Sequence, residues 1–205
     1  MTSSSERFAR AVALIDAANA ADPNQEHNDD GQLQAKELLY GQRMSAMLER
    51  YAAEADEAVR LAVRAQHVQR WKIPRSDFPM DRAGYHRWRT SLYRFHAELA
   101  AGLTLQAGYD AALAARVAAA VGKKALRSNP DSQLVEDVAG LVFIEHYMAP
   151  FAAQKADYSE DKWLDIIAKT WQKLSPRAHE FVLGGGIRLP EHLVPLILKA
   201  VGAAH

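Results

Sequence analysis

Apolar residues recur three or four positions apart along almost the whole chain, and this periodicity constrains the fold more than any other feature. Phe8, Val12 and Ile15 begin the pattern, and Leu193 and Leu196 continue it near the other end. Such spacing gathers the apolar side chains on one face of an α-helix. Convincing strand patterns and hairpin dipeptides are missing. We therefore expect an all-α fold.

Capping residues and prolines divide this pattern into separate helices. Asp81 is placed as an N-cap, while Asn129-Pro130 and Ser175-Pro176 each combine a cap with a proline in the first helical turn. Asp22-Pro23 ends the first helix, and a polar loop is expected over residues 24–31. The expected helices cover residues 5–20, 33–51, 56–70, 82–106, 131–151, 161–173 and 191–201.

The composition is that of an ordinary globular protein. The 205 residues are 49% hydrophobic and 24% charged, which suits one domain over residues 1–205, with 183–205 as an extension after the flexible Gly184-Gly185-Gly186 joint. The absence of cysteine excludes disulfides and thiolate metal sites. No apolar run is long enough for a membrane span, and no export signal is visible, so we expect a cytoplasmic location.

Positive charge is concentrated in one segment of a chain that is neutral overall. Residues 60–96 contain nine Lys or Arg but only two acids, a net charge of +7 that leaves −7 for the remainder. Three histidines and four tryptophan or tyrosine residues lie in the same segment. Cationic, titratable and aromatic side chains gathered in this way indicate a site for an anion.

Part of the basic segment forms a polar stripe along the expected helix at 82–106. At about 100° per residue, several of its side chains share one broad face. They are Arg82, His86, Arg89, Tyr93 and His96. We interpret Arg82, His86 and Arg89 as anion-binding residues. The alternative is a solvated helix surface with a few interhelical hydrogen bonds.

A second group lies at the end of the preceding helix. His67, Arg70 and Trp71 are spaced so that their side chains project together. We interpret His67 as a general acid or base, with Arg70 and Arg75 binding a phosphate or carboxylate. The alternative is that His67 interacts only with the unsatisfied carbonyl groups at the helix end.

Residues outside the basic segment complete the expected site. Glu136 and Asp137 border a strongly apolar helix face, to which Asp137 lies closer. We expect Asp137 to orient His67 or to bind a weakly held metal ion, and a plain salt bridge to a lysine of the preceding helix is the alternative. The remaining candidates for binding the anion are Lys123, Lys124, Tyr40 and Arg43.

A resemblance to a known family extends over nearly the whole chain. It rests on residues 15–19, 37–40, 64–67, 70–75, 85–89 and 134–137. These segments are similar to a family of bacterial and fungal domains of unknown function, whose members are sometimes labelled glutamyl-tRNA synthetase-like. The resemblance implies no synthetase activity, because the chain has no Rossmann signature. Walker loops, nucleophile elbows and HExxH zinc helices are also missing.

The chain more weakly resembles the helical HD phosphohydrolases, in which histidines and aspartates carried on helices commonly hold metal. His67, His96 and Asp137 stand where that resemblance implies catalytic residues. However, Val68 replaces the aspartate of the His-Asp pair, and no histidine occurs around residues 40–44. The resemblance thus implies an HD-like helical scaffold without a cofactor or a tightly bound metal, with room only for a weakly held divalent ion.

Three functional hypotheses follow. The first is binding, and hydrolysis, of a phosphorylated, nucleotide-like small anion in a cleft lined by histidine and arginine. The second is an RNA-binding module, in which the basic segment contacts phosphates and its aromatic side chains stack on bases. The third is a non-catalytic interaction protein, whose helix at 191–201 docks onto a partner instead of closing the core.

Overall fold

The helical periodicity of the sequence is realised as ten α-helices in the computed structural model, which describes residues 3–126, 128–155 and 157–202. They are α1 (Ser4–Ala20), α2 (Lys36–Tyr51), α3 (Glu57–Arg64), α4 (Arg82–Gln106), α5 (Ala111–Val121), α6 (Pro130–Val142), α7 (Met148–Gln154), α8 (Glu160–Trp171), α9 (Pro176–Leu183) and α10 (Val194–Gly202). Short 3₁₀ turns form η1 (Arg70–Lys72), η2 (Arg75–Asp77) and η4 (Glu191–Leu193), and a π-helical segment, η3 (Phe143–Tyr147), joins α6 to α7. The all-α fold class is confirmed.

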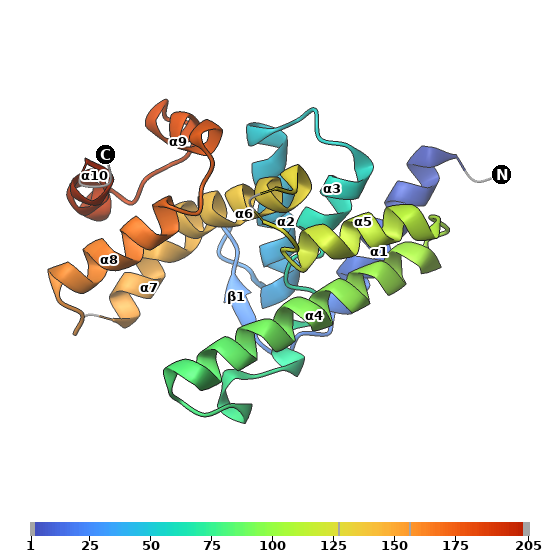
Figure 1. Cartoon of the computed structure of the whole chain (residues 1–205), viewed down its shortest axis with the longest axis horizontal. Helices are drawn as coiled ribbons and strands as arrows, with labels where there is room; N and C mark the ends of the chain where they lie inside the picture. The colour runs from blue at the N-terminus through green and yellow to red at the C-terminus, as the bar shows by residue number, and fades with distance from the viewer. Residues whose placement is uncertain (1–2, 127, 156, 203–205) are drawn as a thin grey trace.

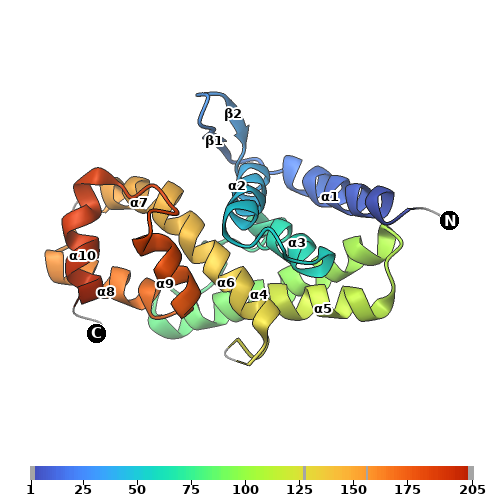
Figure 2. The same ribbon diagram turned by 90° about the horizontal axis from the view of Figure 1, so that it is seen from above.

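The helices are arranged along one long axis. α1 and α5 lie towards one end and α8 and α10 towards the other, with α2, α3 and α6 between them (Figures 1 and 2). The long helix α4 runs beside α5 (Figure 1). One hydrophobic core joins residues from both ends, including Ile15 of α1, Leu141 of α6 and Ile197 of α10. No described helix is both long and apolar enough to cross a membrane.

Local capping explains why most helix starts could be predicted. The Asp81 side chain accepts a hydrogen bond from the backbone N–H of Gly84 at 2.6 Å and so begins α4. Asn129 and Ser175 cap α6 and α9 in the same way, and each is followed by a proline in the first turn. These side chains satisfy N–H groups that a helix leaves without partners, which fixes where it begins.

A β-hairpin occupies most of the region expected to be a polar loop. Strands β1 (Gln25–His27) and β2 (Leu33–Ala35) pair antiparallel, and the hairpin projects away from the helices (Figure 2). In the turn, the Asn28 side chain accepts hydrogen bonds from the backbone N–H groups of Asp30 and Gln32, and Gly31 adopts a φ of +77°. Asp30-Gly31 is a typical hairpin dipeptide, so the interpretation that such dipeptides are missing from the sequence was wrong. Strands of three residues are too short to show the alternating pattern that would have drawn attention to it.

The helix expected at 56–70 is shorter than predicted, because α3 ends at Arg64. Beyond it the chain turns, and Gln69 takes a left-handed conformation with φ +52°. The buried side chain of Asn19 in α1 accepts a hydrogen bond from the Gln69 backbone N–H at 2.9 Å. This contact holds the turn, so His67 lies in a tight bend and not on a helix.

The helix expected at 131–151 is interrupted by the π-helical segment. The backbone N–H of Met148 reaches back five residues to the carbonyl group of Phe143. Pro150 follows and has no N–H to offer to the carbonyl of residue 146, so the regular hydrogen-bond ladder cannot continue there. Such π-helical turns change the direction of the side chains that they carry, here Glu145 and His146.

Candidate functional site

The structure brings His67 and His96 together. Their ring centroids are 5.8 Å apart, although His67 lies in the bend after α3 and His96 on α4. Tyr40 of α2 stacks on His67, with ring centroids 4.1 Å apart and planes 12° apart. His96 is 2% exposed, whereas the His67 side chain keeps 26% of its surface accessible. Two of the three expected catalytic residues therefore share one site.

Glu37 is the acidic partner of His67, although no sequence pattern pointed to it as a site residue. Its Oε2 lies 3.6 Å from His67 Nδ1, and the residue is 6% exposed. The backbone N–H of Glu37 donates to Asp22 at the start of α2. Burial raises the pKa of the Glu37 carboxyl to about 7, and the opposing effect of Arg70 is smaller. The position expected of Asp137, beside His67, is thus held by Glu37.

Three cations affect the titration of His67, and two of them also affect that of His96. Arg70 NH1 lies 3.5 Å from His67 Nε2. Burial lowers the pKa of His67 well below its ordinary value, and Arg70, Lys123 and Arg89 lower it further. Burial, with Arg70 and Lys123, also lowers the pKa of His96 to about 3. Both imidazoles are therefore neutral at pH 7. We call these five residues, His67, His96, Arg70, Arg89 and Lys123, the histidine–arginine cluster.

The positive charge of this cluster is only partly neutralised. Arg70 lies over the Trp88 ring, 4.9 Å from its centroid, and Arg89 donates to the hydroxyl groups of Tyr85 and Tyr93. Among the residues with described positions, no carboxylate lies within ion-pairing distance of either guanidinium group. Lys123 follows α5 in a left-handed conformation and forms a salt bridge with Glu136. A lysine of this segment therefore pairs with an acid of α6, as the alternative interpretation expected, but the acid is Glu136 and not Asp137.

His96 contains a buried polar atom without a partner. Its Nε2 is inaccessible to solvent and makes no hydrogen bond to the described part of the protein. Most buried polar atoms in native proteins are satisfied, and an unsatisfied one costs about 1–3 kcal/mol. An unpaired imidazole nitrogen, in a cluster whose guanidinium groups have no described carboxylate partner, is therefore the feature of this site that points to a ligand.

Asp137 lies in a different polar network. Its Oδ1 accepts from the Ser175 N–H at 2.8 Å and from Gln133 at 2.9 Å, and its Oδ2 accepts from the hydroxyl groups of Ser175 and Tyr51. The carboxylate is 2% exposed and joins the start of α9 to α6. Within residues 3–202, apart from the two positions not described, no three His, Asp or Glu side chains are grouped to hold a metal ion.

The other predicted binding residues are spread over the surface. Arg75 donates to the carbonyl groups of Phe78 and Asp81, and so shapes the loop before α4. Arg82 and His86 are exposed near the start of α4, and Lys124 is exposed beyond α5. The polar stripe of α4 therefore changes along its length, from solvated at Arg82 to buried at His96.

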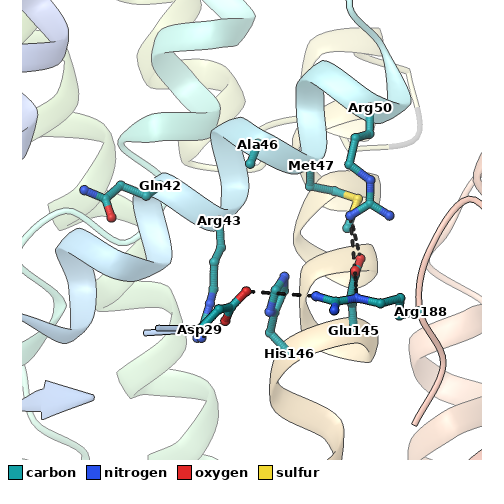
Figure 3. Close-up of a pocket in the computed structure, with 9 residues that line it drawn as sticks. All are labelled: Asp29, Gln42, Arg43, Ala46, Met47, Arg50, Glu145, His146 and Arg188. Atoms are coloured by element: carbon teal, nitrogen blue, oxygen red, sulfur yellow. Dashed lines mark hydrogen bonds and ion pairs between the residues drawn. The ribbon is translucent and has the colours of Figure 1, made fainter. Parts of the chain in front are cut away.

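Arg43 faces a separate cavity of about 280 Å³ between α2, the hairpin, the π-helical segment and Arg188 (Figure 3). Arg43 pairs with Glu26 and Asp29, and it donates to the Tyr147 hydroxyl group. The cavity is lined by Asp29, Gln42, Arg43, Ala46, Met47, Arg50, Glu145, His146 and Arg188. Its other two arginines both pair with Glu145, so the cavity has little positive charge left for an anion.

Comparison with known protein families places the chain in one of them. Residues 9–197 match the family described as domain of unknown function DUF4202. The chain belongs to this family. The predicted resemblance to a domain-of-unknown-function family is thereby confirmed. No curated protein and no solved structure matches this DUF4202 chain, so the synthetase-like label and the HD relationship gain no support from known proteins.

Proposed function

We propose that this DUF4202 protein binds a phosphorylated, nucleotide-like small molecule in the histidine–arginine cluster. The observation that supports this most is the buried, unpartnered Nε2 of His96 in a cluster whose two arginines, Arg70 and Arg89, have no described carboxylate partners. A guanidinium group offers a planar fork of donors that matches phosphate oxygens. An anion here would accept hydrogen bonds from these groups and from His96 in its Nε2–H form.

The cluster also holds a group suited to proton transfer in hydrolysis. His67 is neutral at pH 7, so it could take a proton from the water molecule that attacks the phosphorus atom. As the P–O bond to the alcohol breaks, the protonated imidazole could return that proton to the leaving oxygen. Glu37, on the Nδ1 side, would stabilise the imidazolium ion that forms. The cations would balance charge that develops on the phosphoryl oxygens. The proposed reaction is analogous to that of the HD phosphohydrolases, but it uses no metal ion.

Ligand titration of matched arginine variants tests the proposal. Calorimetry at low ionic strength would measure inorganic phosphate, AMP and a sugar phosphate against wild type, Arg89→Gln and Arg94→Gln. Arg94 lies on the same helix, but it is solvent-exposed and pairs with Glu98. We expect Arg89→Gln to weaken binding by about tenfold or more. Equal losses in both variants, or no binding by wild type, would contradict the proposal.

Hydrolysis is tested separately by release of phosphate from the compounds that bind. His67→Gln removes the proton acceptor while keeping a polar side chain of similar reach. We expect turnover to fall by at least about a hundredfold with little change in affinity. Release of phosphate at an unchanged rate would remove His67 from the mechanism and leave the binding proposal intact.

RNA binding is a second candidate, favoured by the exposed cations near the start of α4. Arg82 and Arg87 are solvent-exposed, as is Tyr85, a side chain on which a base could stack. Arg82→Gln with Arg87→Gln should weaken RNA binding and its salt dependence without changing phosphate affinity. The interaction-protein hypothesis has less support, because Leu193 and Ile197 of the C-terminal segment are buried in the core. Leu198 of the same segment is exposed and would be available to a partner.

A further inference from the structure

The stacking of Tyr40 on His67 points to a role for this tyrosine other than the anion contact expected from the sequence. The two rings are nearly parallel, with planes 12° apart and centroids 4.1 Å apart. Rings in this arrangement make an extended van der Waals contact, which here covers one face of the imidazole. His67 lies in the bend after α3 and not on a helix. The plane of its ring is therefore fixed by neighbouring side chains, and Tyr40 is the one that stacks on it.

The two nitrogen atoms of His67 face groups of opposite kind. Nδ1 lies 3.6 Å from Glu37 Oε2, and Nε2 lies 3.5 Å from a guanidinium nitrogen of Arg70. A guanidinium group carries only donors, so the nitrogen that faces it presents its lone pair, and the ring hydrogen belongs on Nδ1, towards the carboxyl group. The neutral imidazole is thus set in the Nδ1–H tautomer. Its proton-accepting atom is Nε2, on the side of Arg70.

Tyr40 is itself held in place by Tyr147 and Arg43. The Tyr147 ring centroid lies 5.8 Å from that of Tyr40. Arg43 donates a hydrogen bond to the Tyr147 hydroxyl group at 3.1 Å, and its guanidinium carbon lies 5.3 Å from the centroid of the same ring. Arg43 also pairs with Glu26 and Asp29 of the hairpin. A continuous series of contacts therefore runs from the hairpin through Arg43, Tyr147 and Tyr40 to His67.

We propose that Tyr40 is the positioning residue of His67, with Tyr147 and Arg43 supporting it. Tyr40 fixes the plane of the imidazole, so that Nδ1 stays on the side of Glu37 and Nε2 is directed towards Arg70, where the anion would bind. Tyr40 itself makes no contact with the anion. This role rests on the proposed function only in its consequence for hydrolysis, because the orientation of His67 can be measured without a ligand.

The tautomer of His67 in the free protein, measured by ¹⁵N NMR at pH 7, tests the positioning role. In wild type we expect the Nδ1–H form. Tyr40→Leu removes the stacked ring and should give a mixture of tautomers, Tyr147→Leu should do so in part, and Tyr40→Phe, which keeps the ring, should restore the Nδ1–H form. Leu48→Ala is the control for lost stability, because Leu48 is a buried core residue about two turns further along α2. Its His67 tautomer should match wild type.

Phosphate release from the compounds that bind measures the consequence for the proposed reaction. We expect Tyr40→Leu to lower turnover by about tenfold or more, because a misplaced proton acceptor slows the chemical step. Its affinity for inorganic phosphate should change by less than about twofold, because no contact to the anion is removed. Tyr40→Phe should restore turnover, which separates the stacked ring from the hydroxyl group.

The outcomes separate the positioning role from the proposed function. An unchanged His67 tautomer in Tyr40→Leu, or an equal change in Leu48→Ala, would overturn the role of Tyr40. A loss of phosphate affinity in Tyr40→Leu at unchanged turnover would make Tyr40 a binding residue and would overturn it as well. An unchanged tautomer in Tyr147→Leu would remove Tyr147 and Arg43 as its supports. If wild type binds no phosphate compound while the tautomer changes as expected, the proposed function fails and the positioning of His67 by Tyr40 stands.

Discussion

Replacing Asp137 distinguishes a structural carboxylate from a catalytic one. The side chain accepts four hydrogen bonds, two from Ser175 and one each from Tyr51 and Gln133. In Asp137→Ala, Gln133 can turn to solvent, but the Ser175 N–H and the Tyr51 hydroxyl group lose a buried acceptor. Each unsatisfied donor costs about 1–3 kcal/mol, and this cost is partly offset because the variant no longer buries a charged carboxylate. We therefore expect the free energy of unfolding to fall by about 3 kcal/mol.

Urea denaturation measures this loss directly, and thermal melting should show a decrease in Tm of about 6–12 °C for a chain of this size. Ser175→Ala is the milder companion, because it keeps the backbone donor and should cost about 1 kcal/mol as a lost N-cap. Phosphate affinity should be unchanged in both variants well below Tm. A destabilisation below about 1 kcal/mol in Asp137→Ala, or a loss of affinity without one, would refute this reasoning.

Two further predictions concern charge and backbone. Glu37 has a folded pKa of about 7 against 4.5 when unfolded, so its contribution to stability falls as pH rises from 4.5 to 7. Glu37→Gln has no carboxyl group to titrate, so its free energy of unfolding relative to wild type should rise by about 3 kcal/mol between pH 4 and pH 8. Urea denaturation at each pH measures this difference. A difference between the two proteins that does not change with pH would contradict the raised pKa of the buried carboxyl group. A Cβ at Gly186 would lie 2.5 Å from the Phe181 ring, whereas one at Gly102 in α4 meets nothing within 4 Å. Gly186→Ala should therefore lower Tm, whereas Gly102→Ala should raise Tm by increasing the free energy of unfolding by about 0.5–1 kcal/mol. The opposite order of the two Tm values would contradict the close packing of Gly186 against Phe181.

Helix starts were predictable where the deciding contact is local. Asp81 caps α4 through an N–H three residues away, so the cap and the apolar pattern after it are visible in one short stretch of sequence. The end of α3 was not predictable in this way. It depends on the Asn19 side chain, which is 50 residues from the Gln69 N–H that it binds. The sequence around residues 64–70 contains no signal that predicts this contact.

The site was predictable in part for a similar reason. Arg70 and His67 are three residues apart, and their proximity follows from local geometry. Glu37, by contrast, resembles an ordinary acidic residue in the first turn of a helix, where its negative charge would interact favourably with the helix dipole. Its burial against His67 depends on how α2 packs on the bend after α3.

The most direct test of the central claim is ¹⁵N NMR of the histidine side chains during titration with phosphate and pyrophosphate. His96 has a buried Nε2 without a partner and a pKa of about 3, so a bound anion should shift its ring nitrogens and raise that pKa. His67 should respond at the same ligand concentration, and exposed His86 should not. Unchanged His67 and His96 signals at saturating anion, or a response confined to His86, would contradict the account.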